Sequence, residues 1–259
     1  MTEATSMNRS LIVLTCTVNP STDMYQTRRF ENDLRLRDYK KSIEFWVRFV
    51  RRNKKFDLLI LENSSSISKL QDYVGEYKSF KNIRFGECQA DEISQRQGIS
   101  GGELRMLKES NDFFNHKDYG FVWKVTGRSR IANVRQVFYS NNGAEILADR
   151  VFVPRHALNS RIFGMSPELW EEFTTRNIIF DEGDIKPGHF ESMEHYLTTF
   201  ALEMEFKGFR QKSFLKTPIF LEFSGSKNKR VDSIKRRFLL VLLNPIRPLL
   251  IRLLLGSTP

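Results

Sequence analysis

Short runs rich in β-branched and aromatic residues alternate with longer amphipathic stretches along most of the chain, and this alternation limits the possible folds more than any other feature. Strands are expected at residues 10–17, 56–61 and 82–88 and from Phe121 onward. Helices are expected between them, at residues 35–52, 67–77 and 102–114. Alternating strands and helices predict an α/β domain of the Rossmann-like type with a mostly parallel central sheet.

The composition fits one large core and excludes several classes of protein. The chain has 259 residues, of which 40% are hydrophobic, enough for one core or one core with a small appendage. Cys16 and Cys88 are expected to be reduced thiols, and two cysteines alone form neither a disulfide framework nor a zinc site. Neither a secretory signal nor a run of 18 or more apolar residues is evident. We therefore expect a cytoplasmic protein.

The net charge of +10 is concentrated at the carboxyl end of the sequence. Residues 226–259 contain eight Lys and Arg residues against a single acid, Asp232, and so carry +7, which leaves +3 for residues 1–225. A nucleic-acid-binding protein is expected to spread its positive charge over the folded body. This distribution disfavours a nucleic-acid partner and indicates two parts, a domain at 1–225 and a basic tail at 226–259.

The tail combines these basic residues with two leucine-rich segments on either side of Pro245 and Pro248. It is too short and too charged to span a bilayer, and too apolar to stay in water. Amphipathic helices that lie in the headgroup plane satisfy both properties, with Leu in the acyl boundary and Lys and Arg near anionic lipid. We expect residues 230–255 to bind an anionic inner-membrane surface. The alternative is a helix that folds back onto the core or into a dimer.

The strand that starts at Phe121 ends in a basic turn, Lys124-Val125-Thr126-Gly127-Arg128. Open α/β sheets bind ligands just beyond the carboxyl ends of their strands, so Lys124 and Arg128 are expected near a ligand, with Gly127 allowing a close backbone approach. Two cations there suit a phosphate or diphosphate, because Arg binds it through two N–H groups and Lys acts as a point charge. The alternative is a surface turn with solvated charges.

A glycine-rich segment, residues 97–103, is expected to be a loop that opens the helix at 102–114. Its backbone N–H groups could face a phosphate or a sugar. Its spacing matches neither a P-loop nor a dinucleotide fingerprint. The alternative is a flexible surface loop without a ligand.

Several of these features together resemble the nucleotide-sugar glycosyltransferases with a GT-A-like fold that build bacterial O-antigen or capsule polysaccharide. The turn Thr-Cys-Thr-Val-Asn-Pro at 15–20, the Leu-Glu-Asn-Ser end of the second strand at 61–64 and the glycine-rich segment are similar to parts of such enzymes. The most specific feature is Lys124–Arg128, which resembles a Lys-x-Thr-Gly-Arg signature. The resemblance covers roughly residues 10 to 200.

The resemblance implies a nucleotide-sugar donor, with a UDP-sugar favoured, and a glycan or glycolipid acceptor. The residues expected at the donor are Thr15, Thr17, Asn63, Gly101, Gly102, Lys124, Thr126, Gly127, Arg128 and Arg161. Arg161 lies in the basic segment 153–164, whose alternative interpretation is a solvated loop. Typical GT-A enzymes hold a divalent metal with Asp-x-Asp, whereas Lys124–Arg128 stands at that position here, so we expect fixed cations to replace the metal and no cofactor.

A carboxylate on the acceptor side is expected to act as general base if the reaction inverts the sugar configuration. Glu191 is the first candidate because it follows a Pro-Gly loop and precedes a helical pattern at 193–204, and Asp184 and Glu194 are alternatives. An acidic helix N-terminus favoured by the helix dipole would explain the same residues without catalysis. His189 and His195 do not reproduce a zinc signature.

The sequence thus predicts a glycosyltransferase, peripheral on the inner face of the cell membrane, that acts on a lipid-linked surface polysaccharide. A non-catalytic membrane adaptor with the same tail is the main alternative, and a nucleic-acid-binding protein is a further one. The donor sugar, the linkage, the acceptor and the oligomeric state are left open.

Overall fold

The computed structural model describes residues 9–20, 32–89, 91–139, 143–151, 157–176 and 193–221. Its strands are β1 (Ser10–Cys16), β2 (Phe56–Glu62), β3 (Ile83–Glu87), β4 (Phe121–Thr126), β5 (Ile146–Val151), β6 (Ala157–Met165) and β7 (Gln211–Lys212). Its α-helices are α1 (Asn32–Arg52), α2 (Ile67–Val74), α3 (Asp91–Glu109), α4 (Val134–Phe138), α5 (Pro167–Thr175) and α6 (Met193–Phe206). Short 3₁₀ turns include η2 (Gly75–Ser79), η3 (Ser110–Asp112) and η4 (His116–Asp118).

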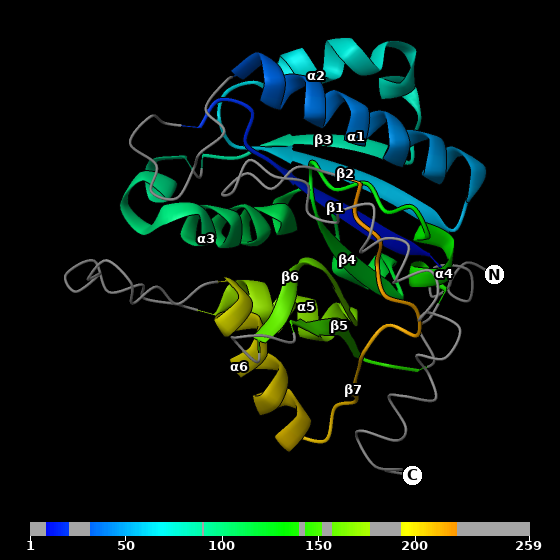
Figure 1. Cartoon of the computed structure of the whole chain (residues 1–259), viewed down its shortest axis with the longest axis vertical. Coiled ribbons are helices and arrows are strands. Elements are labelled where there is room, and N and C mark those ends of the chain that lie inside the picture. The colour runs from blue at the N-terminus through cyan, green and yellow to red at the C-terminus, as the bar shows by residue number, and fades with distance from the viewer. Residues whose placement is uncertain are drawn as a thin grey trace.

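The strands form one seven-stranded sheet in the order β3-β2-β1-β4-β6-β5-β7 (Figure 1). β1 pairs in parallel with both β2 and β4, and β2 pairs in parallel with β3. β6 runs antiparallel to its neighbours β4 and β5, while β7 is parallel to β5. The sheet is therefore mostly parallel with a single reversed strand, which confirms the predicted α/β class.

Helices cover both faces of the sheet and bury a separate apolar cluster on each. In Figure 1, α1 and α2 lie on one side of the sheet, and α3, α5 and α6 lie on the other. Trp46 of α1 and Trp123 of β4 belong to the first cluster, and Trp170 of α5 belongs to the second. β1 is buried on both faces because successive side chains point to opposite sides, Ile12 and Leu14 to one cluster and Leu11 and Val13 to the other.

The helix expected at residues 35–52 is α1, and its apolar residues face the sheet. Ile43, Trp46, Phe49 and Val50 of α1 are all buried against the sheet, and each buried side chain of this size stabilises the fold by about 1.5–3 kcal/mol. Trp46 also donates a hydrogen bond from Nε1 to the carbonyl oxygen of Ser129 at 2.8 Å. This bond joins α1 to the turn that follows β4.

Two sequence predictions about loops are wrong. The glycine-rich segment 97–103 lies inside α3, which starts at Asp91, so glycine's poor helix propensity is overridden there. The solvated-loop interpretation of 153–164 is also wrong, because that segment contains most of β6, which lies between β4 and β5. β6 packs tightly there: a Cβ at Gly164 would lie 2.2 Å from a ring carbon of Phe121.

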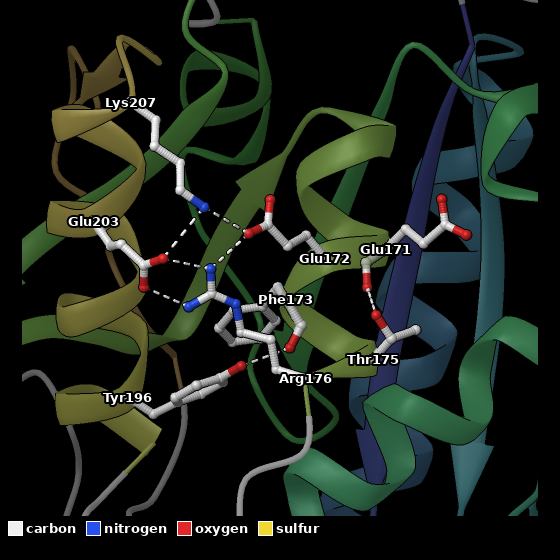
Figure 2. A network of polar contacts seen from close by, with 8 residues as sticks. All are labelled: Glu171, Glu172, Phe173, Thr175, Arg176, Tyr196, Glu203 and Lys207. Atoms are coloured by element: carbon white, nitrogen blue, oxygen red, sulfur yellow. Dashed lines mark hydrogen bonds and ion pairs between the residues drawn. The ribbon is translucent and has the colours of Figure 1, made fainter.

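An ion-pair network fixes α6 against α5 (Figure 2). Arg176 contacts Glu172 and Glu203, both at 2.6 Å, and Lys207 contacts the same two carboxylates at 3.1 and 3.2 Å. Tyr196 adds a hydrogen bond from its hydroxyl to the carbonyl oxygen of Phe173 at 2.7 Å. The first turn of α6, which carries Glu194, is held in place by this packing.

Within the described ranges, no helix combines the length and the apolar character that crossing a bilayer requires. The basic tail at 226–259 lies outside those ranges.

Candidate functional site

The order of the strands places a topological switch point between β1 and β4. After β1 the chain builds β2 and β3 on one side, and it then crosses over to form β4 on the other side of β1. Ligands of open α/β sheets bind at such a switch point, beyond the carboxyl ends of the strands. Thr15 and Thr126 are partners at the end of this pair, so the residues predicted from the two strand ends lie on both sides of the switch point.

Gly127 joins the end of β4 to the end of β1. Its N–H donates to the carbonyl oxygen of Thr15 at 2.9 Å. A Cβ at this position would lie 2.4 Å from Cys16 Sγ and 2.6 Å from the Thr15 carbonyl oxygen. The glycine predicted for close backbone approach is therefore required by the neighbouring strand.

Lys124 lies at the centre of a buried polar network. Its side chain is fully buried, and its ammonium lies 2.6 Å from the Glu103 carboxylate of α3. It also donates to the Thr126 hydroxyl at 3.0 Å and to the Ser160 carbonyl oxygen at 2.6 Å. These three contacts match the three N–H groups of an ammonium, so the charge is fully partnered.

Two further side chains extend this network across the sheet. The Thr15 hydroxyl donates to the same Glu103 oxygen at 2.8 Å. At the other end, the Ser160 hydroxyl of β6 donates to the carboxylate of Glu194 at 2.7 Å. The network thus links β1, β4 and β6 to α3 and α6, and it brings Thr15, Lys124, Thr126 and Glu194 together.

A second polar cluster organises the loops that follow β1 and β2. Glu62, the last residue of β2, is fully buried, and its carboxylate accepts from the backbone N–H groups of Val18 at 3.0 Å, Ser64 at 2.9 Å and Ser66 at 2.7 Å. A carboxylate with this many backbone donors holds both loops in place.

Thr17 and Asn63 connect the same two loops through their side chains. The Thr17 hydroxyl donates to Asn63 Oδ1 at 2.6 Å, and the Thr17 N–H donates to the Tyr39 hydroxyl at 3.0 Å. Asn63 is 3% exposed, and its Nδ2 has no acceptor among the described residues. A buried donor in this state costs free energy until it finds a partner.

Arg128 presents further unpartnered donors in the same region. Its Nε and Nη1 atoms are shielded from solvent and have no hydrogen-bond acceptor among the described residues. Its guanidinium carbon lies 5.9 Å from the centre of the Tyr39 ring. Buried guanidinium donors without partners are rare in folded proteins, so this cation is arranged to receive an acceptor from outside the described protein.

The buried thiol and phenol beside Arg128 remain protonated near neutral pH. Burial raises the pKa of the Cys16 thiol well above its usual value, and the Glu62 carboxylate raises it further. Burial also raises the pKa of the Tyr39 hydroxyl, although Arg35 and Arg128 oppose this effect. A protonated Cys16 is a poor nucleophile, so neither group supplies a negative charge to Arg128.

The remaining predicted donor residues lie in different surroundings. Gly101 and Gly102 are buried within α3, directly before Glu103. Arg161 lies in β6 with its guanidinium carbon 5.7 Å from the centre of the Phe220 ring. Glu191 and Asp184, the first two candidates for a general base, lie outside the described residues.

Two members of the network were not identified as functional residues from the sequence. Glu103 is the last residue of the glycine-rich segment, and Ser160 lies in the basic segment 153–164. The signal that could have identified an acidic partner is the position of the charged Lys124 inside an apolar strand, since a buried charge requires a partner. The identity of that acid depends on how α3 packs.

The described residues contain no group of three or more His, Cys, Asp or Glu side chains that could hold a metal ion.

No protein-family model and no curated protein sequence matches this chain. Its fold is similar to that of several solved structures. The inositol-1-phosphate CTP transferase from T. maritima is 12% identical, with 91% of this chain and 96% of that chain covered and a TM-score of 0.51. This similarity shows a shared fold.

Two other solved structures have lower TM-scores. An active-site mutant of LgtC is 13% identical, with 72% of this chain and 68% of that chain covered and a TM-score of 0.46. Mouse xyloside xylosyltransferase 1 is 9% identical, with coverages of 76% and 82% and a TM-score of 0.43.

Proposed function

We propose that this protein is a nucleotide-sugar-dependent glycosyltransferase that acts at the inner face of a bacterial cell membrane on a lipid-linked surface polysaccharide such as O-antigen or capsule. The observation that carries the proposal is the guanidinium of Arg128, at the switch point of an α/β sheet, with two shielded N–H donors that have no acceptor among the residues the structure describes. The Lys-x-Thr-Gly-Arg resemblance of residues 124–128 supports the same assignment.

In this proposal Arg128 binds the donor diphosphate. Arg binds phosphate oxygens through paired N–H groups, and Nε and Nη1 are both available. Asn63 Nδ2 is a second unpartnered donor, on the β2 side of the switch point. It would hydrogen-bond an oxygen of the nucleotide, because an amide nitrogen is a donor and not an acceptor.

Lys124 has a different role in this proposal from the one expected from the sequence. Its three N–H groups are all bonded to protein oxygens, so we assign it to positioning Glu103 and Ser160. Arg128 alone then neutralises charge on the leaving nucleotide, without a metal ion. Metal independence is part of the proposal, and loss of activity in EDTA would overturn it.

In this proposal the candidate general bases serve the acceptor. Glu191 is our first choice from its sequence context, with Asp184 and Glu194 as alternatives. Glu194 accepts from the Ser160 hydroxyl, which places it two hydrogen bonds from Lys124. The base would remove the proton of the acceptor hydroxyl as the donor carbon is attacked.

Nucleotide binding by the full-length protein is the first test. A ligand at 100 times its Kd stabilises the native state by about 2.7 kcal/mol, which raises the melting temperature by several degrees in a chain of this size. We expect one nucleoside diphosphate or nucleotide sugar to do so in the presence of EDTA. Arg128→Ala should abolish the shift, while Arg105→Gln, a surface substitution on α3, should keep it. A flat response across all nucleotides would favour a non-catalytic membrane adaptor.

A nucleotidyltransferase is a second candidate, because the chain shares its fold with a CTP transferase over 91% of its length. The two reactions release different products. Transfer of a nucleotidyl group from CTP to a sugar phosphate releases pyrophosphate, whereas glycosyl transfer releases the nucleoside diphosphate. Measuring which product forms distinguishes the two candidates.

A further inference from the structure

A basic groove lies away from the candidate site, between α1 and the segment that contains α4. It has a volume of about 730 Å³. Five cationic side chains and one carboxylate line it, a net charge of +4: Lys41, Arg48, Arg52, Arg130, Arg135 and Glu44. Residues 1–225 carry a net charge of only +3, so the net positive charge of this part of the chain is concentrated at the groove.

The spacing along α1 places its cations on one stripe. The intervals from Lys41 to Arg48 and from Arg48 to Arg52 are seven and four residues, which places all three side chains on one face of the helix. Phe45 lies on the same stripe and contributes apolar surface to the groove. The acid Glu44 is already paired with Arg48 at 2.5 Å.

The other cations of the groove remain available to a ligand. Lys41, Arg52 and Arg135 are partly or fully exposed, and none of them forms an ion pair with another residue that the structure describes. Arg130 donates to the carbonyl oxygen of Leu221 at 3.0 Å, a bond that leaves its positive charge uncompensated. The groove therefore suits a ligand that presents several negative charges.

The groove adjoins the point where the described chain ends. The Leu221 N–H donates to the Arg130 carbonyl oxygen at 2.9 Å, and Ile131 and Phe220 form a β-bridge. The basic, leucine-rich segment 226–259 begins five residues after Leu221. This segment carries +7, so the repulsion between like charges argues against it as the occupant of the groove.

From this arrangement we infer that the groove binds anionic phospholipid headgroups and forms, with the chain exit at Leu221, the membrane-facing surface of the domain. The inference rests on the proposed membrane location and adds a second contact to it. Headgroup phosphates satisfy the cations, and the leucine-rich sequence expected at an acyl boundary follows Leu221 along the chain. A nucleic acid would offer phosphates and no partner for those leucines.

This contact orients the enzyme. Arg52 ends α1 just before β2 begins at Phe56, so the groove extends toward the amino-terminal edge of the sheet. The switch point lies at the opposite, carboxyl edge. A domain docked through α1 and α4 would have the amino-terminal edge of its sheet toward the lipid headgroups. The switch point would then lie roughly one strand length farther from the membrane.

The test compares two full-length variants that each lose two exposed positive charges. Arg52→Gln with Arg135→Gln neutralises the groove. Lys108→Gln with Lys117→Gln is the matched control, at the end of α3 and in η4, on the other face of the sheet. Binding is measured by co-sedimentation with phosphatidylcholine vesicles that contain phosphatidylglycerol, and pure phosphatidylcholine vesicles serve as the neutral arm.

We expect the groove variant to lose about 25-fold in affinity for the anionic vesicles, because each basic residue near such a surface contributes about fivefold. The control should lose less than about threefold at the same ionic strength. Equal affinities of the two variants would overturn the inference, as would unchanged vesicle binding together with lost binding to a DNA duplex. Nucleotide-induced melting shifts should be the same in both variants, so a failure of the transferase proposal would be seen separately.

Discussion

Lys124 and Glu103 form an ion pair at 2.6 Å inside the protein, with the lysine side chain fully buried and the glutamate side chain 15% exposed. Such a pair is weak evidence for net stability, because its formation requires the removal of two charges from water. Breaking it from one side is costly, because the remaining charge stays buried without a partner.

Lys124→Met should therefore destabilise the protein by about 3 kcal/mol or more, measured by urea unfolding. Glu103→Gln should also destabilise it. The double variant should lose less than the sum of the two, since no unpaired charge remains. A matched cycle on Arg48 and Glu44, an exposed pair on α1, should give a coupling of about 0.5 kcal/mol or less. Additive losses at Lys124 and Glu103 would contradict the buried-pair interpretation.

Arg128→Met should leave the free energy of unfolding unchanged or increase it, because the substitution removes guanidinium donors that are buried without an acceptor. Its affinity for a nucleoside diphosphate should fall by at least tenfold. Melting curves with and without nucleotide give both quantities from one sample. A marked loss of stability in the absence of ligand would mean that Arg128 has a structural role.

Gly127→Ala should destabilise the protein by about 1–3 kcal/mol, as overpacking typically does. The new Cβ would collide with Cys16 Sγ and with the Thr15 carbonyl oxygen. Adding Cys16→Ala removes the first of these collisions and should restore part of the loss, whereas Cys16→Ala with Gly127 intact should leave a small cavity. If the double variant is no more stable than Gly127→Ala, the sulfur contact is not the source of the strain.

The α5–α6 network should make stability depend on pH in the acid range. Hydrogen bonds from Arg176 and Lys207 lower the pKa of Glu203 to about 2, and Arg176 lowers that of Glu172. A depressed folded-state pKa gives stability that is complete above the unfolded value of about 4.3 and is lost as the pH falls toward the folded one. Wild-type stability should therefore decline between about pH 4.5 and pH 2.

Glu203→Gln tests this assignment, because it removes one of the titrating groups while keeping a similar shape. Chemical unfolding across the acid range should show a flatter decline for this variant than for the wild type. Salt should reduce the difference, since the network is exposed. Parallel pH profiles for the two proteins would assign the acid sensitivity to other carboxylates.

The alternation of strands and helices was sufficient to predict β1 to β4. It also indicated the carboxyl edge of the sheet, where the candidate site lies. β1, β2 and β4 are buried on both faces, so each reads as a nearly continuous apolar run, whereas β3 is only partly buried. β6 was missed because its partly exposed Asn159 and Arg161 interrupt the apolar pattern, and its place between β4 and β5 depends on pairing with distant residues.

The types of residue at the site were easier to predict than their partners. The sequence placed Lys124 and Arg128 at one strand end and implied similar roles for them. In the structure Lys124 is fully bonded within the protein, whereas two donors of Arg128 find no acceptor in the part of the chain that the structure describes. That difference depends on Glu103, which reaches Lys124 because the glycine-rich segment continues as helix, and helix packing of this kind is not encoded in local spacing.

The reversed strand β6 gives the residues around the switch point two different origins. Because β6 runs against β4, its first residues, and not its last, lie at the carboxyl end of β4. One side is therefore made of strand ends and the other of a strand beginning that is bonded to α6 through Ser160 and Glu194. The bond from Lys124 to the Ser160 carbonyl oxygen ties these two sides together, so a shift at the start of β6 would be transmitted to the end of β4.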